Sequence, residues 1–405
     1  MKWLRFFIGL ISILWLPLLI ANDHATLQVS KTIPVTQFTH KIPAPPTINA
    51  SSYILMAGGS RTVLVEHNAH ERIPPASLTK IMTMYVISQA LKSGQLTLDT
   101  EVYVSQKAQQ VEGSRMFIKA GDKVKAKDLI LGMVVASGND ASIAMAEHIA
   151  GSEETFVDIM NTEAKRLGMN ETHFVDCIGM PNPNHYSTAY DLAILSHALI
   201  FDFPEYYSWY SEKWFTYNNI KQPNRNQLLW RSEYVDGIKT GHTNEAGYCL
   251  AASAKKDQTR LISIIINTPS DASRTEGTQK LLTYGFHFFK THLLFTPKDI
   301  VSQPRIWKGN LKTIQLGVPH NMLVTIPVGQ YEQLKITTQL PDPIIAPVNK
   351  GEKLGTMTVM LNDQVLLKSP LIAKESVSKG SFFSRLSDSI SMVIHGATDD
   401  DNESP

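Results

Sequence analysis

The chain has 405 residues, of which 43% are hydrophobic and 19% are charged. This composition is that of an ordinary globular protein and excludes a disordered or collagen-like chain, while the length favours two or three domains. The 38 lysines and arginines nearly balance the 37 aspartates and glutamates. Because affinity for nucleic acid needs a basic surface, this balance argues against a nucleic-acid-binding protein.

The N-terminal segment is typical of an exported protein. Two basic residues precede an apolar run from Phe6 to Ala21, and a polar stretch follows. This pattern predicts a signal peptide over residues 1–21, cleaved after Ala21. An uncleaved membrane anchor is the alternative, but Pro17 interrupts the run, which is shorter than the roughly 20 residues that a spanning helix needs.

The two cysteines, Cys177 and Cys249, are too few for a disulfide framework. They could pair in an oxidising compartment, but we favour two separate small core residues. The histidines are scattered and no His-Glu-x-x-His motif is present, so we expect neither a metal site nor a cofactor.

Residues 46–291 carry alternating strand and helix patterns, which predict a mixed α/β domain after a proline-containing linker at 22–45. The helix over 77–94 follows two prolines and ends at a glycine, as helix start and stop signals require. The predicted strands are 52–56, 62–68, 235–241, 247–256 and 260–268, and the predicted helices are 77–94, 128–138, 139–151, 153–168, 188–200 and 272–289.

Residues 292–373 consist of short β-rich segments separated by proline, glycine and Asn-Asp, which predicts a small all-β domain. Its predicted strands are 314–318, 323–328, 334–340, 356–362 and 364–373.

The C-terminal segment predicts an amphipathic helix over residues 374–396 and an acidic tail over 397–405. At 100° per residue most of its apolar side chains fall within an arc of about 120°. Such a helix either binds a membrane surface or docks on the chain's own β domain, and the pattern leaves both open because its polar face is poor in lysine and arginine. The apolar set is Phe382, Phe383, Leu386, Ile390, Val393 and Ile394.

Ser77 and Lys80 stand three residues apart at the start of a predicted helix, and therefore on one face. A serine hydroxyl is a weak nucleophile until a base removes its proton, and a lysine kept neutral by burial can be that base. The spacing alone is weak evidence, because Ser253–Lys256 and Ser376–Lys379 share it.

Two further motifs occur once each and strengthen this interpretation. Ser137-Gly-Asn139 lies between two predicted helices, and Lys239-Thr240-Gly241 lies at the end of a predicted strand whose edge could bind an extended peptide. The three motifs in this order are a strong joint signal.

The chain resembles the D-alanyl-D-alanine carboxypeptidases, the low-molecular-mass penicillin-binding proteins of the type 5 and 6 group. The resemblance extends to PASLTKIMT, VVASGNDAS, MFIKAGDKV, NRNQLLW, VDGIKTGHT and KLLTYGFHFF, and it covers residues 46–290 closely. It implies a penicillin-binding-protein and β-lactamase-like transpeptidase domain, in which an antiparallel sheet is flanked by helices and joined to an all-helical subdomain. The β-rich segment and the last helix are similar in order and character to that family's second domain and membrane anchor.

The resemblance implies that Ser77 is the acylated nucleophile and Lys80 its base. Ser137 would relay a proton, and Asn139 would hold the substrate amide. The backbone N–H groups of Ser77 and His242 would form the oxyanion hole, where a helix start and a strand can both face the developing charge.

The third motif, Lys239-Thr240-Gly241, would bind the substrate. Lys239 would supply positive charge, and Thr240 would bind the terminal carboxylate with help from Arg225 of NRNQLLW. One departure from the family is the stretch QKAQQVEGSRMF, which is shorter than the usual loop beside the active site and bears on deacylation and substrate preference.

The implied reaction removes the terminal D-Ala from peptidoglycan pentapeptide stems, with β-lactams as covalent inhibitors. The implied location is the periplasmic face of the bacterial inner membrane, with the terminal helix as a peripheral anchor. A D,D-endopeptidase, a weak β-lactamase and a non-catalytic scaffold are alternatives. Chain length and the additional β domain argue against the β-lactamase, and the intact motifs argue against the scaffold.

Overall fold

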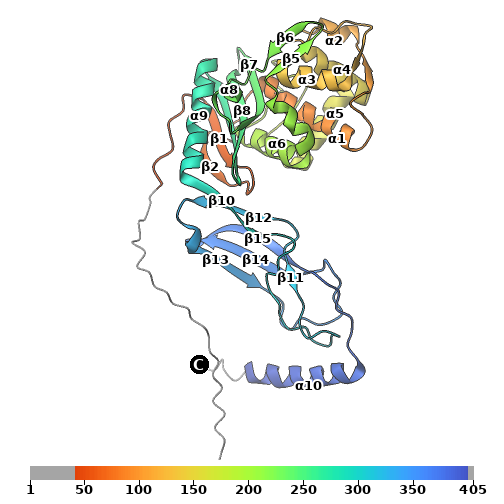
Figure 1. Cartoon of the computed structure of the whole chain (residues 1–405), viewed down its shortest axis with the longest axis vertical. Helices are drawn as coiled ribbons and strands as arrows, with labels where there is room; N and C mark the ends of the chain where they lie inside the picture. Colours follow the sequence, from red (N-terminus) through yellow and green to blue (C-terminus); the bar gives the residue numbers. More distant parts are fainter. Residues whose placement is uncertain (1–41, 400–405) are drawn as a thin grey trace, which may run out of the picture. The chain divides into compact units, whose positions relative to one another are not determined.

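The computed structural model describes residues 42–399 (Figure 1). The predicted signal peptide, residues 22–41 of the predicted linker and residues 400–405 of the predicted acidic tail lie outside the described residues. Cys177 and Cys249 are both buried and unpaired, which agrees with two separate core positions.

The first region is built on a five-stranded antiparallel sheet in the order β2-β1-β9-β8-β7. Helix α9 (Asp271–Phe288) covers one face of this sheet, and a group of helices lies on the other (Figure 1). The strands, in chain order, are β1 (Ser52–Ala57), β2 (Val63–His67), β7 (Val235–Thr243), β8 (Gly247–Lys256) and β9 (Thr259–Thr268).

Side chains along β1 and β9 alternate between two separate hydrophobic cores. Ile54 and Ile264 belong to the core shared with the helical group, whereas Leu55 and Ile265 pack with Leu281 of α9. Successive side chains of a strand point to opposite faces, and both faces are covered, so the strands read as continuous apolar runs.

The helical group is bounded by local capping signals. The hydroxyls of Ser152 and Thr188 accept hydrogen bonds from the first turns of α5 and α6, and Gly151 and Gly168 end α4 and α5 in the left-handed conformation. The helices predicted from the sequence are confirmed. In this group they are α1 (Lys80–Lys92), α3 (Ala126–Ala136), α4 (Asn139–Ala150), α5 (Glu153–Leu167) and α6 (Ala189–Asp202). Three shorter helices were not predicted, namely α2 (Gln106–Gln110), α7 (Pro204–Tyr207) and α8 (Leu228–Arg231).

Two small hairpins accompany the helical group. They pair β3 (Glu101–Tyr103) with β4 (Lys123–Lys125), and β5 (Trp214–Tyr217) with β6 (Ile220–Pro223).

The second region is all β, as predicted. A four-stranded sheet in the order β11-β15-β14-β13 shares a hydrophobic core with the pair β10-β12. Its strands are β10 (Phe289–Phe295), β11 (Leu316–Gly317), β12 (Met322–Pro327), β13 (Leu334–Gln339), β14 (Lys353–Leu361) and β15 (Gln364–Ala373).

The last helix, α10, spans Phe382–Asp399 and so begins later than the predicted 374–396. The residues before it are extended instead, because Val377 forms a bridge with Val348 and Lys379 one with Gly309. The helix also runs into the segment assigned to the acidic tail. Within residues 42–399, no helix is long and apolar enough to cross a membrane.

Candidate active site

Ser77 lies in the 3-10 turn η1 (Ala76–Thr79), which leads directly into α1. Lys80, the first residue of α1, places its Nζ 2.9 Å from Ser77 Oγ and 3.0 Å from the carbonyl oxygen of Ile178. The Lys80 side chain is 1% exposed. Burial lowers the pKa of Lys80 from 10.5 to about 7, against the opposing effect of Asp176. The nucleophile and base suggested by the sequence are thus in contact.

Ser137 ends α3 in the left-handed conformation, with φ 61°, and the chain turns there into α4. Its side chain is buried, and so is that of Asn139, the first residue of α4. Asp140, the next residue, is close enough to Lys80 to affect its pKa electrostatically. The second motif is therefore near the first.

The stretch QKAQQVEGSRMF is tied to this second motif. Asn139 Nδ2 donates to the carbonyl of Glu112 at 2.6 Å, and the backbone N–H of Asn139 donates to Ser114 at 2.7 Å. Asp140 accepts from the backbone N–H groups of Met116 and Phe117. The loop and the Ser-x-Asn motif therefore hold each other in place.

The third motif lies on β7, one of the two edge strands of the sheet. A Cβ placed on Gly241 would lie 3.2 Å from the carbonyl oxygen of Pro75 and 3.3 Å from the backbone nitrogen of Ser77. The strand thus passes directly beside the turn that carries Ser77, at a distance that favours glycine.

Lys239 and Thr240 are buried on this strand, and Lys239 Nζ donates to the carbonyl of Thr240 at 2.9 Å. Burial holds the pKa of Lys239 well below its usual value, and the positive charges of Lys80 and Arg225 lower it further. Arg225 is exposed to solvent but near enough to act on both lysines. His242 is exposed, with its ring 4.1 Å from that of Tyr248.

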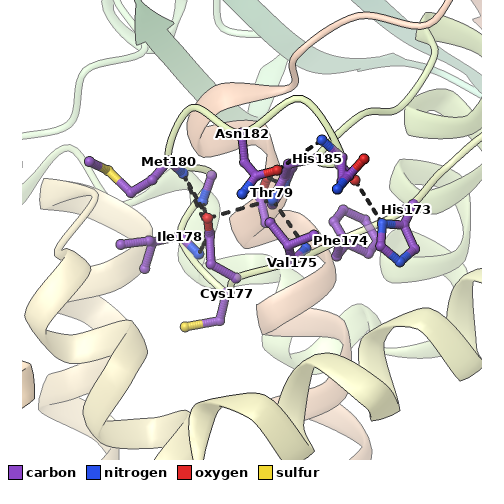
Figure 2. Close-up of polar contacts among 12 residues, drawn as sticks. Thr79, His173, Phe174, Val175, Cys177, Ile178, Met180, Asn182 and His185 are labelled. Carbon is purple, nitrogen blue, oxygen red and sulfur yellow. Dashed lines mark hydrogen bonds and ion pairs between the residues drawn. The ribbon is translucent and has the colours of Figure 1, made fainter.

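Sequence reasoning missed three groups of this site. Ile178 contributes only its carbonyl, which has no residue-type signal. Asp176 accepts a hydrogen bond from the backbone N–H of Ile178, and His185 contacts Thr79 of the turn that carries Ser77 (Figure 2). Asp176 followed by Gly179 is a turn signal that could have indicated a structured loop, but not its neighbour.

Two family models match the chain in succession. Residues 39–270 match the model described as D-alanyl-D-alanine carboxypeptidase. Residues 289–379 match the one described as penicillin-binding protein 5, C-terminal domain. Fold and site together define an active-serine enzyme of the penicillin-binding class.

Individual relatives agree with the family models. D-alanyl-D-alanine carboxypeptidase DacC of Escherichia coli is 44% identical over 358 residues, which cover 86% of this chain and 90% of the relative. The structure of penicillin-binding protein 5 from Haemophilus influenzae is 38% identical with a TM-score of 0.79, covering 83% of this chain and 100% of that chain. The ampicillin-bound structure of penicillin-binding protein D2 from Listeria monocytogenes is 30% identical with a TM-score of 0.55, covering 60% of this chain and all (100%) of that chain.

The chain therefore belongs to the D-alanyl-D-alanine carboxypeptidase family of serine peptidases. It is a serine-type D-Ala-D-Ala carboxypeptidase and a penicillin-binding protein, with the predicted transpeptidase-like α/β domain, β-rich second domain and terminal helix. The family and its ampicillin-bound member imply D-Ala-D-Ala peptides as substrates and β-lactams as ligands.

Proposed function

We propose that Ser77 is the acylated nucleophile and that Lys80 is the base that takes its proton. The observation that supports this proposal is the 2.9 Å distance between Lys80 Nζ and Ser77 Oγ, with Lys80 buried. Because the pKa of Lys80 is about 7, much of the amine is neutral at neutral pH and can accept the hydroxyl proton as the oxygen attacks.

We assign proton relay to Ser137 and substrate positioning to Asn139. Asp140 beside them acts electrostatically on Lys80, which supports a place for the motif next to the base. The Nδ2 group of Asn139 already donates to Glu112, so the amide oxygen is the atom that we assign to the substrate N–H.

The substrate would lie along β7. An edge strand offers unpaired backbone groups to an extended peptide, and β7 is such a strand. Thr240 would bind the terminal carboxylate with Arg225, while Lys239 would supply positive charge beside them. The backbone N–H groups of Ser77 and His242 would form the oxyanion hole, which the close approach of Gly241 to Ser77 supports.

In this mechanism Ser77 Oγ attacks the carbonyl carbon of the penultimate D-Ala of a pentapeptide stem. The peptide C–N bond breaks, and the terminal D-Ala leaves as the free amino acid after its nitrogen is protonated. Water then hydrolyses the ester and releases a tetrapeptide and Ser77. A β-lactam would acylate the same oxygen by opening its ring.

The test is incubation with a D-Ala-D-Ala pentapeptide and with a crosslinked stem dimer, comparing the wild type with Ser77→Ala. We expect free D-Ala from the wild type and none above background from the variant, which should also fail to retain labelled penicillin.

The surface variant Asp99→Ala serves as the matched control, because Asp99 pairs only with exposed Lys125 in the part of the chain described. D-Ala release that persists in Ser77→Ala would overturn the assignment of the nucleophile. Separated stem peptides without free D-Ala would favour the endopeptidase.

We also propose that the protein is exported and bound to the membrane surface of the bacterial cell envelope through α10. Phe382, Phe383, Leu386 and Ile390 are exposed on this helix. Asp388, on another face, accepts from the backbone N–H of Lys308 at 2.6 Å. The helix thus contacts the β region with a polar residue and leaves apolar side chains open to a lipid surface.

Sedimentation with anionic lipid vesicles tests this proposal. The chain from residue 22 should sediment with vesicles, and the chain ending at Ala373 should stay in the supernatant. Replacing Phe382, Phe383 and Leu386 by serine should have the same effect without loss of D-Ala release. Sedimentation of the truncated chain would contradict the anchor.

The domain division into 46–291 and 292–373 is likewise a proposal. The matches at 39–270 and 289–379 support it, with the junction near the start of β10 at Phe289. Limited proteolysis should cut between these units before it cuts within either.

A further inference from the structure

The loop that follows α5 packs against the turn that carries Ser77. Gly179 has a φ of 87°, and a Cβ there would lie 1.8 Å from the carbonyl oxygen of Ala76 and 2.9 Å from Thr79 Oγ1. No side chain fits at this position. Backbone of the loop and backbone of η1 are therefore in direct contact, next to the acylation site.

The carboxylate of Asp176 holds the shape of this loop. Its Oδ1 accepts from the backbone N–H groups of Ile178 at 2.8 Å and Gly179 at 2.5 Å, and its Oδ2 accepts from Met180 at 3.1 Å. Such a turn fixes the peptide plane of Ile178, whose carbonyl receives Lys80 Nζ. Asp176 thus acts on the base through one intervening peptide group.

His185 is the second residue of this loop that contacts η1. Its ring is buried, and Nε2 lies 2.8 Å from Thr79 Oγ1, within the turn between Ser77 and Lys80 (Figure 2). The backbone N–H of Val175 donates to Nδ1 at 3.3 Å, so Nδ1 is the acceptor and Nε2 carries the proton toward Thr79. Nδ1 also lies 3.6 Å from Asp176 Oδ2, so the two residues are neighbours on the same loop.

The Ile178 carbonyl can only accept a hydrogen bond. A neutral amine has two N–H donors and one lone pair, so an N–H directed at this carbonyl leaves the lone pair available toward Ser77 Oγ. Without that partner the long, flexible Lys80 side chain could rotate its lone pair away, and orientation of a base is worth large factors in rate.

We propose that Asp176 and His185 are positioning residues for acylation, which hold the Ile178 carbonyl and the η1 turn so that the lone pair of Lys80 faces Ser77. This proposal rests on the assignment of Ser77 and Lys80 above. Neither residue touches the reacting atoms, and neither belongs to the three sequence motifs.

The test measures the second-order rate of acylation by a fluorescent penicillin between pH 5 and pH 9. Asp176→Ala removes the carboxylate that accepts from all three backbone N–H groups, and we expect the acylation rate to fall about 100-fold. Asp176→Asn keeps an acceptor oxygen for Ile178 and Gly179, and we expect a smaller loss. His185→Leu should lower the rate more than His185→Gln, because the glutamine amide can still donate to Thr79.

The pH profile separates positioning from general loosening of the structure. Asp176 raises the pKa of Lys80, whereas burial and Arg225 lower it, and Asp140 and Cys177 are the other groups that act on it. In Asp176→Asn the acid limb should therefore move to lower pH while the plateau falls. A merely loosened site would admit water to Lys80 and move the limb to higher pH.

Asp99→Asn and His320→Gln are matched controls at exposed positions. Wild-type rates and an unshifted acid limb in folded Asp176→Asn and His185→Leu, judged by thermal unfolding, would overturn the proposal. Persisting acylation in Ser77→Ala would instead overturn the assignment of the nucleophile, so the two failures are distinguishable. If Asp176→Ala does not fold, Asp176→Asn carries the test.

Discussion

The α/β region and the C-terminal β region bury different kinds of side chain. Lys80, Asp140, His185 and Lys239 are all at most 3% exposed within the first region. Among the described residues of the second, the buried polar groups on its strands are hydroxyls, namely Thr291, Thr325 and Ser369. Buried titratable groups are costly unless paired, and they concentrate where chemistry is performed. The buried ionisable side chains named here thus lie in the region that carries the three motifs, whereas the described strands of the other region bury only hydroxyls among their polar groups.

Lys80→Met should give the largest loss of acylation rate among the variants described here. Removal of the base lowers penicillin acylation by about 10²–10⁴-fold. The midpoint of thermal unfolding should stay the same or rise, because methionine avoids the desolvation of a buried amine. An acylation rate within a few fold of the wild type would contradict the role of Lys80, and a large fall in the unfolding midpoint would show that Lys80 contributes to folding.

Met357→Ala tests the β region, where we expect a loss of stability and no change in acylation. Met357 is fully buried there, and its truncation should cost about 2–5 kcal/mol of unfolding free energy. The acylation rate of the folded protein should not change. Calorimetry combined with penicillin labelling checks both parts, and a slower acylation in the folded variant would mean that the two regions are coupled.

A pair of glycine substitutions sharpens the comparison further. Gly179 and Gly351 both have a φ of 87°, so alanine meets the same backbone strain at each position. At Gly179 the new Cβ would also meet the Ala76 carbonyl, whereas none of the described atoms lies within 4 Å at Gly351. Gly179→Ala should therefore cost about 1–3 kcal/mol more than Gly351→Ala, and it alone should slow acylation. Equal urea midpoints for the two variants would contradict the packing of the loop on η1.

The last prediction concerns the pH dependence of acylation and of stability. With a Lys80 pKa of about 7, acylation should decrease about tenfold per pH unit well below pH 7, as the neutral amine is lost.

The lowered pKa of Lys80 also makes the stability of the protein depend on pH. The unfolded chain binds more protons than the folded chain between about pH 7 and pH 10.5 at this residue, so its contribution to stability rises with pH in that window. The unfolding free energy of the wild type minus that of Lys80→Met, measured by urea unfolding at several pH values, isolates this contribution, and a value that falls as the pH rises would contradict it.

Local patterns were sufficient for most of the secondary structure. The long helices between 77 and 289 and the strands β11 to β15 were predicted because side-chain period, caps and turns act within a few residues. The short helices α2, α7 and α8 and the strand β10 were not predicted. The start of α10 was placed too early, because the bridges from Val377 and Lys379 to distant segments compete with helix formation there. A pattern cannot show such a competition.

The sequence by itself determined the family and the motif residues Ser77, Lys80, Ser137, Asn139 and Lys239, since their types and order are the signal. Only the tertiary structure brought in the Ile178 carbonyl and His185, which are 98 and 106 positions away from Lys80 and Thr79, respectively. It also decided that Cys177 and Cys249 stay apart. The physical reason is that a backbone carbonyl has no residue-type signature, and a contact between distant segments depends on how the whole chain packs rather than on any local period.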